Sequence, residues 1–436
     1  MVRPEWVWTP QGLLTHHAVQ IGSGIIVEVA PAERYPHVDV DLPGRLLLPG
    51  LVNAHSHAFQ RSFRGHVQHR PRGRDDFWSW RERMYAAANG LSPEGVQAVS
   101  ALAFLEMVEA GVTRVGEFHY LHHQADGTPY TDPDELAHRV RAAAEEVGLG
   151  ITLLRVAYQR GGAGLSLRAD QRRFADADPD RVLAALERLA GAGDVGLAPH
   201  SVRALDRSYL EALGAWDGVV HAHVSEQPAE NEACVGEHGL SPLALLDACG
   251  LVSSRFTAVH LTHPLPGDID RMHGAEATVC VCPSTELDLG DGFLPVEARQ
   301  RLRLCLGSDS HAQIDLLREA TTLETHARAV AGRRNVLTPE GVRHGLSERL
   351  LAAASTAGSR ALGRDERGIV VGAPADLVAV DLRRTAAVGV PPLEAAALVA
   401  TADWVEQVWV GGQPQLTEGR HPRAEEIVAR AAPFLP

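Results

Sequence analysis

The 436-residue sequence contains no lysine, so arginine supplies all 41 of its basic side chains other than histidine. A chain without lysine cannot form a Schiff base through a side-chain amine. It also cannot place a carbamylated lysine between two metal ions. The sequence therefore excludes both of these catalytic devices, whatever the codon usage that removed lysine.

Cysteine and long apolar runs are also scarce. Five cysteines are too few for a disulfide framework in a chain of this length, which predicts a reducing, cytoplasmic location. No stretch approaches the roughly 20 apolar residues of a membrane span. The first residues, MVRPEWVWTPQGLLTHH, lack the apolar core of a signal peptide. We therefore expect no membrane partner.

The charge balance is acidic, with 55 Asp and Glu against 41 basic residues and a formal net charge of −14. A nucleic-acid partner would require a basic face, so this balance argues against one. Hydrophobic residues make up 45% and charged residues 22%, as in ordinary folded proteins. The composition excludes a mainly disordered chain.

Eight short apolar runs alternate with helical segments between about residues 46 and 335. Their apolar character is continuous, which is typical of parallel strands buried on both faces. Eight strand–helix units predict an α/β fold, a (β/α)8 TIM barrel. The runs are RLLLPGLVN, TRVGEF, GITLLRVAY, DVGLAP, GVVHAHV, FTAVHL, ATVCVCP and LRLCLGSD.

The segments between the strands carry helix signals. Ser92, Ser241 and Thr338 each precede a proline, the pattern of a hydroxyl N-cap followed by proline at the first helical position. Ala-rich segments with Arg and Glu also predict helices, at 134–148, 180–191 and 313–332. The Gly- and Arg-rich stretch 159–178 predicts a long loop after the third barrel strand, where long loops often carry function.

Both ends of the chain read as short strands separated by Gly and Pro turns. Because chain termini often lie close together, we expect one small β-sandwich domain built from both. The predicted division is 1–47 and 365–436 for this domain and 48–364 for the barrel.

His55 and His57 follow the first predicted barrel strand in LVNAHSHAFQR. Side chains at i and i+2 of a strand point to the same side, so these two imidazoles can share one metal ion. Active sites of TIM barrels lie at the carboxyl ends of the strands, which is where this pair stands.

Other strand ends carry similar side chains. Two strand-one histidines, one strand-five histidine and an aspartate would give a site of three nitrogens and one oxygen, with room for water. His223 is a better candidate than His221, because Glu226 follows three residues later. His221 fits an inward, hydrogen-bonded strand histidine, and His263 fits packing or capping. The strand-end residues are His200, His221, His223, His260, His263 and Asp309.

Three of these residues suit proton transfer. A metal lowers the pKa of its bound water toward about 7, and a nearby carboxylate can then take the proton. Asp309 could both bind the metal and accept that proton, Glu226 lies near the expected water, and His260 could hold the group under attack. Cys280 and Cys282 share the i, i+2 spacing but have no second pair, so we interpret them as buried small apolar residues.

These motifs resemble the amidohydrolase superfamily, in its deaminase branch. The landmarks are LLLPGLVNAHSHAFQR, His after strand four, HxxE at strand five, His at strand six and LGSDS. Within that branch, NAHSHAFQRSFRG, DDFWSWRERMY, GEFHYLHH, APHSVRA and HVSEQ resemble the N-formimino-L-glutamate deiminase family of histidine degradation. The resemblance covers nearly the whole chain. With no lysine available, it implies the single-metal subtype.

The resemblance implies hydrolysis of a formimino C=N bond, releasing ammonia and N-formyl-L-glutamate. It assigns one Zn²⁺ to His55, His57, His223 and Asp309, and proton transfer to Glu226 and His260, although these ligands also suit iron(II) and manganese(II). It also implies a homodimer. The implied substrate contacts are Gln60, Arg81, Tyr120, His200 and Arg203.

Arg81 and Arg203 fit this assignment, because the planar guanidinium group of arginine is well suited to binding a carboxylate. A chain with a net charge of −14 also needs local positive charges to bind a substrate with two carboxylates. Arg61 and Arg64 are weaker candidates. Two alternatives remain open. One is a related deaminase acting on a purine, pterin or thioadenosine-type base, and the other is a catalytically inactive barrel that serves as a scaffold.

Overall fold

A computed structural model describes residues 1–68, 76–365 and 367–436. Its central feature is a sheet of eight parallel strands, each hydrogen-bonded to the next in chain order, which confirms the predicted TIM barrel. The strands are β6 (Leu51–Ser56), β7 (Val112–His119), β8 (Gly150–Ala157), β9 (Val195–Pro199), β10 (Val220–Val224), β11 (Phe256–His260), β12 (Thr278–Val281) and β13 (Arg303–Leu306).

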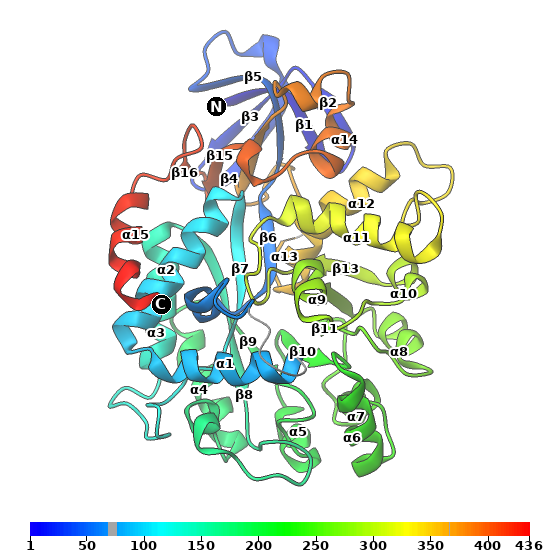
Figure 1. The fold of residues 1–436 in the computed structure, drawn as a ribbon. Helices are drawn as coiled ribbons and strands as arrows, with labels where there is room; N and C mark the ends of the chain where they lie inside the picture. Colours follow the sequence, from blue (N-terminus) through cyan, green and yellow to red (C-terminus); the bar gives the residue numbers. More distant parts are fainter. Residues whose placement is uncertain (69–75, 366) are drawn as a thin grey trace.

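Helices surround this sheet, as Figure 1 shows. Their inward faces join one continuous apolar core with the strands, because the strands bury both faces. The helices of the barrel are α1 (Phe77–Gly90), α2 (Pro93–Glu109), α3 (Glu135–Val147), α4 (Pro179–Ala190), α5 (Arg207–Leu213), α6 (Pro228–His238), α7 (Pro242–Ala248), α8 (Asp268–Gly274), α9 (Pro283–Leu289), α10 (Val296–Arg301), α11 (Leu316–Ala331), α12 (Gly345–Ala354) and α13 (Thr356–Ala361).

The barrel closes at a short seam between its first and last strands. Ser56 and Asp309 form a single parallel bridge there. The Asp309 N–H donates to the His55 carbonyl at 3.0 Å, and the His57 N–H donates to the Asp309 carbonyl at 3.1 Å. Three predicted metal ligands, His55, His57 and Asp309, thus make the backbone hydrogen bonds that close the barrel.

The two ends of the chain form a second, mixed sheet, which confirms that both termini build one separate β unit. It lies at the top of Figure 1, on the side where the barrel strands begin. Its strands run in the order β16-β15-β14-β5-β1-β3-β4, with β2 paired to β1. They are β1 (Val2–Thr9), β2 (Gly12–Thr15), β3 (His17–Gly22), β4 (Ile25–Pro31), β5 (Val40–Pro49), β14 (Leu377–Asp381), β15 (Val405–Val410) and β16 (Gln413–Leu416). Helices α14 (Pro392–Leu398) and α15 (Ala424–Ala431) follow β14 and β16.

The apolar run RLLLPGLVN was predicted as one strand and is two. Its first half belongs to β5 in the terminal sheet, and its second half is β6 in the barrel. The chain crosses between the sheets at Gly50, where a Cβ atom would lie 2.1 Å from Oγ1 of Thr113. Only glycine fits such a close approach, so this residue sets the junction.

Two of the three predicted helix starts are confirmed. The Ser92 hydroxyl accepts from the N–H of Gly95, and that of Ser241 accepts from Ala244. The start predicted at Thr338 is wrong, because α12 begins only at Gly345. Gly341 lies between them with φ of +74°, a left-handed conformation that interrupts a helix.

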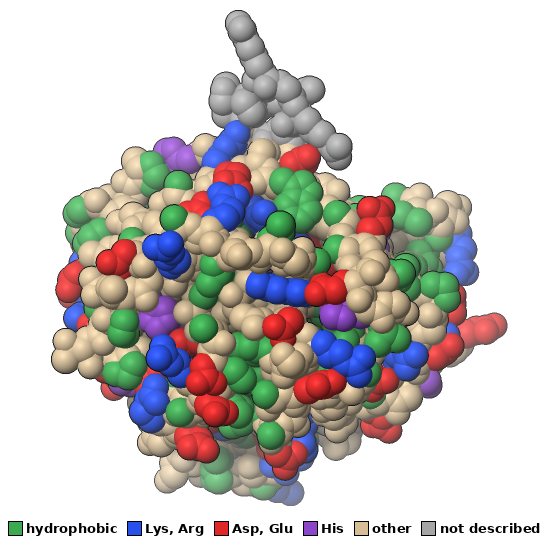
Figure 2. All heavy atoms as spheres, turned by 90° about the horizontal axis from the view of Figure 1, so that it is seen from below, with side chains coloured by type: hydrophobic (Ala, Val, Ile, Leu, Met, Phe, Trp, Pro, Cys, Tyr) green, Lys and Arg blue, Asp and Glu red, His purple; other side chains and the backbone are tan. Residues whose placement is uncertain are grey.

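Figure 2 views the molecule from below, opposite the terminal sheet. Acidic and basic side chains are interspersed on this face, with no broad region of one sign visible. Among the described residues, no helix is both long enough and apolar enough to cross a membrane.

Candidate metal centre and active site

Four buried side chains converge at the carboxyl ends of the barrel strands. His55 and His57 come from the end of β6, His223 from β10 and Asp309 from the residues after β13. One ligand atom from each lies within 4.8 Å of the other three. Nε2 of His55 and Nε2 of His57 stand 3.1 Å apart, and both lie within 3.3 Å of Oδ1 of Asp309.

The hydrogen bonds of two imidazoles fix which nitrogen faces the cluster. Nδ1 of His57 donates to the carbonyl of Phe118 at 3.1 Å, and Nδ1 of His223 donates to the carbonyl of His200 at 2.9 Å. Because a carbonyl only accepts, Nε2 carries the lone pair in both rings. The Nε2 lone pairs of His57 and His223 and the carboxylate of Asp309 converge on one place, so these residues fit a divalent metal ion.

The protonation states agree with this interpretation. Burial lowers the pKa of His55 to about 3, so the ring is neutral. Burial alone would raise the pKa of Asp309, but the adjacent His55 and His57 rings and the charge of His260 hold it well below its usual range. His55 is therefore neutral and Asp309 ionised, the forms that bind metals.

The backbone at two site residues is strained. His260 and Asp309 adopt positive φ angles of 71° and 47°, in the left-handed region that non-glycine residues rarely occupy. Such conformations persist at functional sites, where the surrounding structure holds them in place. Here they turn both side chains at the ends of their strands toward the cluster.

His260 lies among three carboxylates. Its Nδ1 is 3.4 Å from Oε1 of Glu286, and its Nε2 is 3.8 Å from Glu226 and 3.6 Å from Oδ2 of Asp309. Burial would lower the pKa of His260, but the hydrogen bond with Glu286 and the charges of Glu226 and Asp309 raise it to about 10. The ring can therefore donate hydrogen bonds from both nitrogens.

Arg203 lies between two buried carboxylates, those of Glu226 and Glu230. Its Nη2 donates to Glu226 at 3.0 Å, and its Nε lies 3.8 Å from Glu230. Burial would lower the pKa of Arg203, but both carboxylates raise it. Burial raises the pKa of Glu230 to about 7, with Arg203 opposing the shift. Sequence reasoning had not singled out Glu230.

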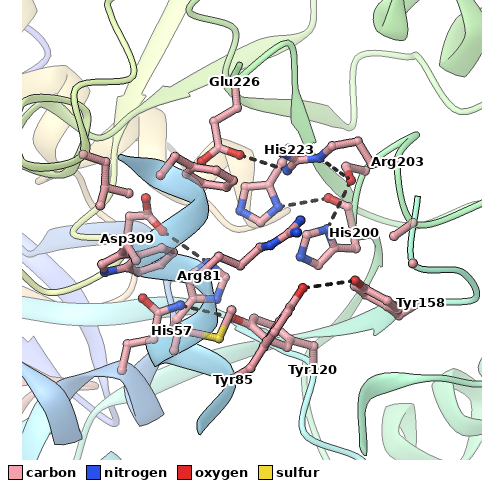
Figure 3. A pocket seen from close by; sticks show the side chains of 18 of the residues that line it. His57, Arg81, Tyr85, Tyr120, Tyr158, His200, Arg203, His223, Glu226 and Asp309 are labelled. Carbon is pink, nitrogen blue, oxygen red and sulfur yellow. Dashed lines mark hydrogen bonds and ion pairs between the residues drawn. The ribbon is translucent and has the colours of Figure 1, made fainter. Parts of the chain in front are cut away.

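The cluster opens into a cavity at the mouth of the barrel. All five predicted substrate contacts line this one cavity, together with His57, His223, Glu226 and Asp309. Figure 3 shows the Arg81 side chain pointing into it, toward His200. Arg81 stacks on the ring of Trp78 at 4.6 Å, and no ion pair engages it within the described part of the chain.

Gln60 and Tyr120 form one wall beside the metal cluster. The Gln60 amide donates to the Tyr120 hydroxyl at 3.0 Å, while Oε1 of Gln60 is buried and has no partner in residues 1–68, 76–365 and 367–436. His200 packs edge-on against Tyr158 with ring centroids 5.0 Å apart. An unpartnered buried acceptor in the wall is available to a donor on a bound molecule.

Two tyrosines in the cavity were missed by the sequence analysis. The hydroxyls of Tyr85 and Tyr158 lie 3.4 Å apart, and the amide of Gln171 donates to both, at 3.2 and 3.0 Å. Tyr158 directly follows β8, the third barrel strand, so the strand-end rule used for the histidines could have found it. Tyr85 lies four residues after Arg81, on the same side of α1.

The remaining candidates fall outside the cluster. Nε2 of His221 donates to the carbonyl of Ala361 at 2.8 Å, which agrees with the prediction of a hydrogen-bonded strand histidine. His263 donates to the carbonyl of Asp291 at 2.6 Å, and Arg61 and Arg64 both pair with Glu106. The cysteines are all buried free thiols.

Comparison with known proteins places this architecture in a family. The model of the amidohydrolase family matches residues 46–414. The formimidoylglutamate deiminase of Pseudomonas aeruginosa is 35% identical, over 97% of this chain and 95% of the relative. The chain belongs to the amidohydrolase family.

Two crystal structures extend the comparison. An amidohydrolase from Brucella melitensis is 34% identical and superposes with a TM-score of 0.91, covering 99% of this chain and 98% of that one. An adenosine deaminase from Xanthomonas campestris with bound zinc is 27% identical, with a TM-score of 0.83 over 99% and 97% of the two chains.

Proposed function

We propose that the protein hydrolyses N-formimino-L-glutamate to N-formyl-L-glutamate and ammonia. The observation that carries this proposal is the single cavity that joins a His/Asp cluster to Arg81 and Arg203. A substrate with two carboxylates and a C=N bond needs both features side by side. The 35% identity to the formimidoylglutamate deiminase of Pseudomonas aeruginosa supports the same substrate.

The residues that would hold the cation are His55, His57, His223 and Asp309. When bound, a divalent cation would lower the pKa of a water molecule and so make it nucleophilic near neutral pH. We propose zinc as that cation, because three imidazoles and one carboxylate suit it and the zinc-containing adenosine deaminase shares the fold.

The protein's own groups would move the protons. Asp309 and Glu226 both lie near Nε2 of His260 and can accept the proton of the attacking water. Glu226 would deliver a proton to the imine nitrogen, so that ammonia leaves as the better leaving group. As the carbon under attack becomes tetrahedral, His260 would donate a hydrogen bond to the nitrogen bonded to that carbon. Water is added and ammonia is lost, which leaves a formyl group.

Substrate binding would rest on the other side of the cavity. Arg81 is without an ion pair among the described residues and is available to a carboxylate, to which a guanidinium can bind in a bidentate manner. Arg203, Tyr120 and His200 would complete the contacts with the glutamate part. The buried Oε1 of Gln60 would accept a hydrogen bond from an amidine N–H.

The test is ammonia release from N-formimino-L-glutamate by the zinc-loaded enzyme, with identification of N-formyl-L-glutamate as product. Adenosine and guanine serve as competing substrates, because the aromatic residues Phe77, Trp80 and Tyr158 also line the cavity and could stack on a base. The proposal is supported if the enzyme releases ammonia from formiminoglutamate but not from adenosine or guanine. Preferential turnover of a base would replace it with the related-deaminase function.

The scaffold alternative is tested by a metal assay, because an inactive scaffold would carry no stoichiometric zinc. The role of Asp309 is tested by the Asp309→Asn variant. If Asp309 binds the metal and moves a proton, turnover should fall by about 10²–10⁴-fold while the protein stays folded. A turnover like that of the wild type would overturn the assigned role. The homodimer, the cytoplasmic location and the division at residues 48 and 364 stay predictions.

A further inference from the structure

A second set of metal-binding atoms lies beside the first. His260 ends β11, Cys282 caps the N-terminus of α9, and Asp309 follows β13. One ligand atom from each lies within 4.8 Å of the other two, and all three residues are buried. Nε2 of His260 has no hydrogen-bond partner among the residues that the structure describes, although the residue is fully buried. An unsatisfied imidazole nitrogen thus points into this set.

Asp309 stands between the two sets. Its Oδ1 lies 3.3 Å from His55 and 3.2 Å from His57, whereas its Oδ2 lies 3.6 Å from Nε2 of His260. The two oxygens of one carboxylate therefore face two different groups of nitrogens. Two-metal sites often use such a carboxylate to bridge ions about 3.5–4 Å apart.

The charge around the second set favours a cation. Glu226 approaches Nε2 of His260 to 3.8 Å, and Glu286 approaches Nδ1 to 3.4 Å. Glu286 also accepts from the backbone N–H of Cys282 at 2.9 Å. The same carboxylate thus positions two of the three donors, and together with Asp309 it offsets the repulsion that a second divalent ion would meet.

The donor types define which ions fit. A thiolate, an imidazole and a carboxylate suit zinc and the softer cadmium, whereas magnesium and calcium prefer oxygen ligands alone. A thiophilic ion would displace two protons into solvent as it binds, one from the Cys282 thiol and one from Nε2 of His260.

We propose that His260, Cys282 and Asp309 form a second, inhibitory site for a thiophilic divalent cation. An ion there would occupy Nε2 of His260 and so remove the group that contacts the reacting centre. The inhibition rests on the proposed function, whereas the binding of the ion does not.

The test uses the enzyme loaded with one equivalent of zinc and titrated with cadmium. We expect a second metal per chain by equilibrium dialysis, together with a thiolate-to-cadmium charge-transfer band in the ultraviolet. Cys282→Ser should lose the band and weaken binding of the second ion by at least about tenfold. Cys282→Ala gives a second test should the serine variant fail to fold.

Cys280→Ser is the matched control, because Cys280 is equally buried two residues earlier and lies outside the set. It should keep the band. No band in the wild type, or a band that survives in Cys282→Ser, would overturn the proposal. Loss of the band in Cys280→Ser would also overturn it, since the ion would then lie among the thiols.

The activity measurement separates the two proposals. Cadmium should inhibit the wild type and Cys280→Ser, while Cys282→Ser should need at least about tenfold more cadmium and keep its basal turnover. An enzyme inactive on formiminoglutamate that still shows the Cys282-dependent band would refute the function and leave the metal site standing. Cadmium binding without inhibition would refute the inhibitory role.

Discussion

Nη2 of Arg203 donates a 3.0 Å hydrogen bond to Oε2 of Glu226, so a residue assigned to substrate binding holds a residue assigned to proton transfer. The dashed line between them in Figure 3 marks this contact. Arg81 has no comparable tie to the catalytic groups among the described residues. The two arginines should therefore respond differently to substitution.

Arg81→Met should raise KM for formiminoglutamate by roughly 10- to 100-fold with little change in kcat, because it removes a charge-assisted contact with the substrate alone. Arg203→Met should raise KM and also lower kcat, because Glu226 loses its partner. Steady-state kinetics of the two variants distinguishes the roles. Arg61→Met is the control, since Arg61 is already paired with Glu106. Equal effects of Arg81→Met and Arg203→Met on kcat would contradict this division.

Glu286→Gln should lower kcat by about 10- to 100-fold while KM and zinc content stay near the wild-type values. The amide keeps the shape of the side chain and can still accept from the N–H of Cys282. It removes the negative charge that faces Nδ1 of His260, so the ring is held in its orientation less firmly. Kinetics and metal analysis of the purified variant check this, with Glu297→Gln on α10 as the control. An unchanged kcat would show that His260 needs no support from Glu286.

Removal of the metal should destabilise the whole barrel, because three of its ligands lie at the seam between β6 and β13. Free cation at 1,000 times its Kd would contribute about 4 kcal/mol to the free energy of unfolding. Thermal melting should therefore show a lower Tm after chelation and recovery on adding zinc. Asp309→Asn should melt like the chelated protein and respond little to zinc. Identical Tm values with and without metal would contradict the coupling.

Glu319 should make stability depend on pH. Burial raises its pKa from 4.5 to about 8, and a hydrogen bond from Ser284 only partly opposes this. Because the folded pKa lies above the unfolded one, the stabilisation is complete below about pH 4.5 and is lost as the pH rises toward 8.

Glu319→Gln, which resembles the protonated form, should therefore gain stability relative to the wild type by up to about 4 kcal/mol between pH 5 and pH 9. Urea unfolding at both pH values measures the difference. Glu187→Gln, at an exposed position of α4, should show none. A difference between Glu319→Gln and the wild type that stays constant with pH would refute the buried-acid interpretation.

The sequence predicted the barrel strands and the residues at their carboxyl ends, because a local pattern marks both. Continuous apolar runs marked the barrel strands, and side chains just after them marked the cluster, because parallel strands all end at the same rim. That rule brought together His55, His223 and Asp309, which are separated by up to about 250 residues in the chain.

Other features depended on tertiary contacts that no local pattern reveals. The break at Gly50 follows from the proximity of Thr113, and the missing helix at Thr338 follows from a left-handed turn. The pairing of Arg203 with Glu226, and the approach of Cys282 to His260, depend on how neighbouring strands end relative to each other. A charge or a thiol in a sequence does not say which partner it will meet.

The bridge between Ser56 and Asp309 has a consequence for the newly synthesised chain. The early histidines leave the ribosome long before the aspartate that completes their coordination. A growing or truncated polypeptide thus exposes imidazoles but cannot assemble the full ligand set. Full coordination of the cation becomes possible only once the first and last strands have met, so a completed ligand set reports that the cylinder has been finished.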